Sequence, residues 1–157
     1  MRAGRITAPP MSSHSPSVAG LKPPADWRRR NVRRLRTAGG PRAPQRVRAW
    51  LQANTDWLPD ELEKNLLLLT SELVNNCVLH GEAGADDVIE VELQATPTTL
   101  RAQVTDPGCG FAPTGRKGEM DDPGGWGLVL VERIAASWGV ERAECTRVWF
   151  ELAAAAA

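Results

Sequence analysis

The feature that most constrains the fold is a pair of alternating runs, "VIEVELQA" at residues 88–95 and "TLRAQVTD" at residues 99–106. Apolar side chains alternate with acids in the first run and with arginine and glutamine in the second. Because successive side chains of a strand point to opposite sides of a sheet, each run has one apolar face. The short link "TPT" favours a hairpin. A hairpin with one apolar face needs other elements to cover that face.

Three segments predict the covering helices. The first, "APQRVRAWLQAN", spaces apolar residues at intervals of three to four. The second follows Pro59, carries a leucine stripe and stops at Gly81, and the third is "WGLVLVERIAASWGV" at residues 126–140. Residues 26–37 predict an irregular edge strand, and "VWFEL" predicts a closing strand. We therefore expect an α/β sandwich of two layers, with about three helices on one face of a mostly antiparallel sheet.

Composition and charge set the expected organisation and compartment. Residues 1–25 predict a disordered arm rich in Pro, Ser and Ala, residues 26–153 one domain, and residues 154–157 an alanine tail. No apolar run is long enough to span a membrane or resembles a signal peptide, and three cysteines without CxxC spacing favour a reducing cytoplasm.

The net charge of the chain is zero, but the charged residues are distributed unevenly along it. Residues 1–48 hold twelve Lys or Arg and one acid, a net charge of +11, and residues 49–157 hold seven Lys or Arg and 18 acids, a net charge of −11. The basic segment either binds an acidic partner or is simply solvated. Nucleic acid is not an expected partner, because no DNA-binding motif or aromatic interleaving accompanies the arginines.

Polar residues interrupt the second helix in the stretch "SELVNNCVLHG". Glu72 and Asn76 are four residues apart and share one helical face, with Asn75 and His80 alongside. This polar file is either a satisfied buried hydrogen-bond network or the wall of a ligand site. The sequence of this helix alone leaves both interpretations open.

Two glycine-bearing segments favour the ligand site. Asp106 ends a strand and is followed by Gly108 and Gly110 in "DPGCGF", which permits a tight turn and the close approach of a flat ligand. Further along, "GGWGLVLV" leads three glycines directly into a helix start, where free amides and the helix dipole favour phosphate. No Gly-Lys-Ser/Thr follows, which excludes a Walker loop.

These three segments, in this order and spacing, resemble the N, G1 and G2 boxes of the GHKL ATPase superfamily. That group includes DNA gyrase, heat-shock chaperone ATPases, mismatch-repair ATPases and sensor histidine kinases. The similarity extends over residues 43–152 and is closest to the small bacterial anti-sigma factor serine/threonine kinases. The resemblance implies a Bergerat-type ATP-binding fold, with ATP and Mg²⁺ as cofactors and a homodimeric state.

The resemblance also implies roles for individual residues. Asn76 matches the magnesium ligand, Glu72 the proposed base for the attacking hydroxyl, and Asp106 the acceptor of the adenine amine. The remaining positions expected to contact nucleotide are His80, Gly108, Gly110, Gly125, Gly127, Leu128 and Thr146. Thr146 lies within one residue of the threonine that often supports the adenine-site aspartate. Relatives often carry a Gly-Lys-Thr-like segment there, whereas this chain has "CTR".

Three functions are compatible with these residues. The first is a kinase that sequesters a sigma factor or similar target and phosphorylates a serine on an anti-sigma-factor antagonist. The second is an ATP-binding interaction module without phosphotransfer. The third, a catalytic domain separated from a histidine kinase, would need a helix bearing a phosphoacceptor histidine. Glu72 and Asn76 together favour the kinase.

Overall fold

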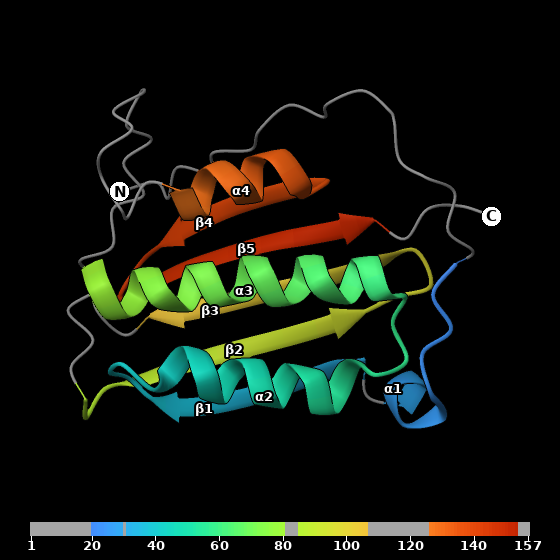
Figure 1. The fold of residues 1–157 in the computed structure, drawn as a ribbon, viewed down its shortest axis with the longest axis horizontal. Coiled ribbons are helices and arrows are strands. Elements are labelled where there is room, and N and C mark those ends of the chain that lie inside the picture. Colours follow the sequence, from blue (N-terminus) through green and yellow to red (C-terminus); the bar gives the residue numbers. More distant parts are fainter. Residues whose placement is uncertain (1–19, 30, 81–84, 107–125, 154–157) are drawn as a thin grey trace.

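The computed structural model describes residues 20–29, 31–80, 85–106 and 126–153 of the 157-residue chain. Within these ranges the helices are α1 (Ala25–Arg29), α2 (Ala43–Thr55), α3 (Asp60–His80) and α4 (Trp126–Ile134). The strands are β1 (Val32–Ala38), β2 (Val88–Ala95), β3 (Thr99–Asp106), β4 (Ser137–Arg142) and β5 (Thr146–Ala153). They form one antiparallel sheet in the order β1-β2-β3-β5-β4 (Figure 1).

Helices α2, α3 and α4 lie side by side over one face of the sheet, which confirms the predicted two-layer α/β sandwich (Figure 1). Burial alternates along β3, where Leu100, Ala102 and Val104 are buried and the residues between them are half-buried. The alternation that predicted the hairpin therefore places its apolar face beneath the helices. The core centres on Phe150 of β5 and on Leu66, Leu69 and Leu73 of α3, which are buried.

The face of the sheet away from the helices carries paired charges. Ion pairs join side chains that lie opposite each other on neighbouring strands, such as Arg34 with Glu92 (2.6 Å) and Arg101 with Glu151 (3.1 Å). Trp149 also lies on this face, where the guanidinium of Arg101 stacks 3.9 Å from its ring centroid. Cross-strand charge pairs and a cation–π contact thus take the place of a second helical layer on this face.

The segment before β1 differs from the predicted irregular strand. Residues 32–38 do form an edge strand, but Ala25–Arg29 form the short helix α1. The indole of Trp27 is buried and meets Trp57 edge-on at 5.5 Å between ring centroids, so packing of this aromatic pair replaces strand pairing. Leu21, within the predicted arm, is also buried, and its amide donates to the carbonyl of Pro97 (2.9 Å). The domain boundaries themselves stay a prediction.

The third predicted helix is wrong in its second half. Helix α4 ends at Ile134, and Ser137–Arg142 pairs with β5 as the edge strand β4. The backbone of Gly139 lies against the Trp149 ring, because a Cβ at that position would be 2.8 Å from an indole carbon. Pairing with β5 and this close contact override the helix-compatible apolar spacing of the segment. In the described residues, no helix is long and apolar enough to cross a membrane.

One end of the sheet gathers the termini of several elements, and we call it the site end. Asp106 ends β3, Thr146 begins β5 and Arg142 ends β4, all in register with one another. The C-terminal end of α3 and the N-terminal end of α4 lie at this same end, at the left of Figure 1. Helix α1 lies at the opposite end, so two separate ends of the sheet carry these two groups of residues.

Candidate functional site

Two buried polar side chains face each other at the site end. Asp106 and Thr146 are directly opposite in the antiparallel pair of β3 and β5, and their exposed fractions are 1% and 2%. Residues in this relation have Cβ atoms about 5 Å apart. Thr146, one residue from the position at which the resemblance expects a supporting threonine, is thus directly opposite Asp106. A carboxylate and a hydroxyl buried side by side offer a donor and acceptors to a ligand.

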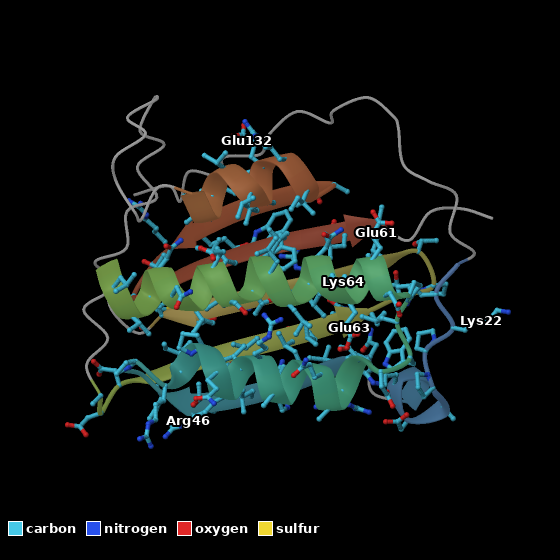
Figure 2. All side chains as sticks on the ribbon, in the orientation of Figure 1. Lys22, Arg46, Glu61, Glu63, Lys64 and Glu132 are labelled. Carbon is cyan, nitrogen blue, oxygen red and sulfur yellow. The ribbon has the colours of Figure 1, made fainter. Side chains whose placement is uncertain are left out.

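Helix α3 presents its two flanks to different neighbours. The carboxylate of Glu63 accepts a hydrogen bond from the Thr55 hydroxyl of α2 (3.3 Å), so the Glu63 flank faces α2, as Figure 2 shows. At 3.6 residues per turn, Asn76 is rotated about 220° from Glu63, and Glu72 about 180°. Since α3 lies between α2 and α4 (Figure 1), Asn76 is on the flank that faces α4. The predicted polar file therefore lines the α4 side of α3.

Asn76 is one of the buried polar side chains of α3 that have an atom without a hydrogen-bond partner in the described part of the chain. Its exposed fraction is 3%, and its Nδ2 atom has no hydrogen-bond partner among the described residues. A buried amide without a partner costs on the order of 1–3 kcal/mol. Of the two interpretations of the polar file, a fully satisfied network does not hold for Asn76. The geometry favours a ligand or a further part of the protein at this amide.

Cys77 links helix α3 to Asp106. Burial, and to a smaller extent the negative charge of Asp106, together raise the pKa of the Cys77 thiol to about 12. That electrostatic effect reflects the approach of the C-terminal half of α3 to the end of β3. Sequence reasoning missed Cys77 because a cysteine inside an apolar helix carries no signal that distinguishes a pocket wall from core.

The remaining predicted site residues fall into three groups. Glu72 is half-buried, one turn before Asn76, and Gly127 and Leu128 lie in the first turn of α4, where Leu128 packs against the core. His80 is the last residue of α3, and its side chain is outside the described part. Gly108, Gly110 and Gly125 also lie outside the described residues. The structure thus brings Asn76, Asp106 and Thr146 to one end of the sheet and leaves the glycine loops untested.

The residues present fit a magnesium ion that is held mostly by a ligand. Among the described residues, no group of three or more His, Cys, Asp or Glu side chains is arranged to hold a metal. Mg²⁺ is usually bound by one or two protein oxygens and completes its shell with phosphate and water. The amide of Asn76 carries one such oxygen, Oδ1, on the flank facing α4, whereas Nδ2, which has no partner among the described residues, is a donor and no metal ligand. Asn76 would therefore be a magnesium ligand only together with bound phosphate.

Comparison with known proteins agrees with this geometry. A sequence model described as histidine kinase-like ATPase domain matches residues 40–152, whereas no curated protein matches the chain. A similar solved structure is that of the RsbU and RsbW domains of Rv1364c from Mycobacterium tuberculosis, with a TM-score of 0.57 and 20% identity. The similarity covers 80% of this chain but only 34% of that chain. The family match spans α2 to β5, and the chain belongs to the histidine kinase-like ATPase family.

Proposed function

We propose that this protein binds ATP·Mg²⁺ at the site end and acts as a regulatory serine/threonine kinase of the anti-sigma factor type. The observation that carries the proposal is the buried pair of Asp106 and Thr146, with the unsatisfied amide of Asn76 on the facing helix. Asp106 would accept a hydrogen bond from the adenine base, and Asn76 would hold the magnesium ion on the phosphates. The two residues come from separate elements at the same end of the sheet, so one nucleotide can contact both.

Each described residue has a distinct role in this proposal. The carboxylate of Asp106 accepts a hydrogen bond from the exocyclic amine of adenine, and the hydroxyl of Thr146 supports that carboxylate. The amide oxygen of Asn76 holds Mg²⁺, which neutralises phosphate charge when bound. The first turn of α4, which contains Gly127, offers backbone amides and the positive end of a helix dipole to phosphate. These groups position the nucleotide, and positioning of this kind supplies much of the catalysis in phosphoryl transfer.

Glu72 is the proposed general base. Its carboxylate accepts the proton of a serine hydroxyl on the protein substrate as that oxygen attacks the γ-phosphorus, and the bond between phosphorus and the bridging oxygen of ADP breaks. Glu72 lies on the same flank as Asn76 and is half-buried, so it is accessible from the nucleotide side of α3. Base catalysis of this kind contributes roughly 10²–10⁴ in rate.

The proposed protein partners come from the type of kinase. We expect an anti-sigma-factor antagonist as the phosphorylated substrate and a sigma factor or similar target as the sequestered partner, with the kinase as a homodimer. The family match and the fold shared with the structure that contains the RsbW domain support this choice. This chain covers only 34% of the matched chain, so its partners are proposals of their own.

The nucleotide site is tested by substitution of Asp106. We expect Asp106→Asn to weaken ATP binding by roughly 10- to 100-fold, because a charge-assisted hydrogen bond to the base is lost. Isothermal titration with ATP·Mg²⁺ measures the change, and the exposed Asp86→Asn is the matched control. Equal affinities for wild type and Asp106→Asn would reject the adenine assignment.

Phosphotransfer is tested by substitution of Glu72. We expect Glu72→Gln to retain ATP binding but to lose roughly 10²–10⁴ in the rate of label transfer from ATP to antagonist proteins encoded beside this chain. Glu61→Gln, an exposed acid at the start of the same helix (Figure 2), is the control. ATP binding by the wild type without transfer to any antagonist would instead support the ATP-binding module without kinase activity.

A further inference from the structure

Arg142 lies in the same cross-strand row as the proposed adenine residues. It is the last residue of β4 and is directly opposite Thr146, which in turn is opposite Asp106 on β3. Neighbouring strands are about 4.8 Å apart, so the backbone of Arg142 is roughly 10 Å from that of Asp106. The predicted third helix covered residues 126–140 and left no strand before Arg142, so no register between Arg142 and Thr146 could be predicted from the sequence.

The side chain of Arg142 belongs to the helix-covered face of the sheet. The preceding residue, Glu141, forms an ion pair with Arg147 of β5 (3.2 Å) on the opposite face. Val140, two residues before Arg142, is buried in the core under the helices. Because side chains alternate along a strand, Arg142 lies on the same face as Val140, Asp106 and Thr146.

Among the described residues, Arg142 forms no ion pair, in contrast to the other arginines of the strands. The other arginines on the described strands each form an ion pair, namely Arg33 with Asp26, Arg34 with Glu92, Arg36 with Glu90, Arg101 with Glu151, and Arg147 with Glu141. Within the described part of the chain Arg142 is exposed and has no ion pair of this kind. An exposed arginine without an ion pair at this end of the sheet is available to an anionic ligand.

The N-terminal end of α4 lies at the same end of the sheet as Arg142. The chain runs along α4 away from the site end and returns along β4, so β4 ends where α4 begins (Figure 1). The helix has nine residues, and the positive end of its dipole points toward the site end. A guanidinium and a helix dipole therefore act on the same region.

We propose that Arg142 is a further nucleotide-binding residue, whose guanidinium contacts a phosphate of the bound nucleotide. This inference rests on the proposed function. The backbones of Arg142 and Asp106 are roughly 10 Å apart, with Thr146 between them. The guanidinium can therefore contact a part of the nucleotide other than the adenine amine that donates to Asp106. Planar guanidinium groups bind phosphate oxygens in bidentate fashion, more specifically than lysine does.

The inference is tested with ligands that differ only in phosphate number. Titration with adenosine, ADP and ATP, each with Mg²⁺, is compared for wild type, Arg142→Ala and Arg142→Lys. We expect Arg142→Ala to bind ATP at least about 10-fold more weakly and adenosine with unchanged affinity. The lysine variant should be intermediate for ATP. Arg46→Ala, an exposed arginine on α2 (Figure 2), is the control and should bind all three ligands as the wild type does.

The outcomes separate this inference from the function on which it rests. If the wild type binds neither ATP nor ADP, the proposed function fails and the phosphate contact fails with it. If the wild type binds ATP and Arg142→Ala binds it equally well, only the role of Arg142 is overturned. A loss of adenosine affinity as large as the loss of ATP affinity would place Arg142 at the base or the pocket wall and would also overturn the phosphate contact.

Discussion

At the scale of single residues, burial removes water from the polar groups of the site, so that they need other hydrogen-bond partners. Asn76, Asp106 and Thr146 are nearly inaccessible to solvent although each carries groups that water would satisfy. Cys77, beside them, is kept as a neutral thiol by burial and by the charge of Asp106. These four residues come from three elements, and their proximity is a property of the fold.

The shifted pKa of Cys77 predicts how stability depends on pH. Unfolding lowers this pKa from about 12 to its ordinary value of 9.0, so above about pH 9 the unfolded chain releases a proton that the folded protein retains. The unfolded state then binds fewer protons, and the free energy of unfolding falls with rising pH by up to about 1.4 kcal/mol per unit. Urea denaturation between about pH 9 and 10.5 should give a shallower slope for Cys77→Ala. Parallel slopes would contradict a raised thiol pKa.

At the scale of elements, alternating patterns were reliable, and boundaries set by tertiary contacts were not. Strands β2 and β3 were predictable because each alternates strictly and only a short turn joins them. Strand β4 was not predictable, since Trp138 and Val140 continue the apolar spacing of α4 and only pairing with β5 makes them a strand. Glu72 and Asn76 could be identified from their local spacing on one helix. Arg142 could not, because its place opposite Thr146 depends on the pairing of β4 with β5.

The contact between β4 and β5 predicts the effect of a methyl group at Gly139. Gly139→Ala would place Cβ within 2.8 Å of the Trp149 ring and should destabilise the protein by about 1–3 kcal/mol through overpacking. Chemical denaturation measures this difference. In Gly139→Ala/Trp149→Leu the smaller leucine side chain removes the clash. The free energy of unfolding of the double variant should therefore fall by less than the sum of the two single changes. Additive losses would show that the close contact is not the cause.

At the scale of the whole molecule, the aromatic packing of α1 and the proposed binding residues lie at opposite ends of the sheet. Helix α1 packs Trp27 against Trp57 at one end, and the guanidinium of Arg33 stacks 4.9 Å from the Trp27 ring centroid. The proposed nucleotide residues lie at the other end (Figure 1). A change at the α1 end is therefore expected to alter the folding equilibrium without altering the contacts made to a nucleotide.

Truncation of Trp27 tests this separation. Trp27→Ala removes a buried aromatic side chain and should lower the free energy of unfolding by about 3–5 kcal/mol. The dissociation constant for ATP·Mg²⁺, measured by titration well below the melting temperature, should stay unchanged. Lys22→Ala, whose side chain points into solvent nearby (Figure 2), should alter neither quantity. A weaker nucleotide affinity in Trp27→Ala would show that the two ends are coupled.

The ion-paired outer face has a consequence for colloidal behaviour. Strand β1 forms one border of the sheet, and its Arg34 and Arg36 are largely exposed even though each lies beside a glutamate. Two molecules that approached border to border through this strand would bring like charges together before any main-chain bonds formed. Arginine on an exposed edge strand thus disfavours edge-to-edge association and favours a protein that stays dispersed at high concentration.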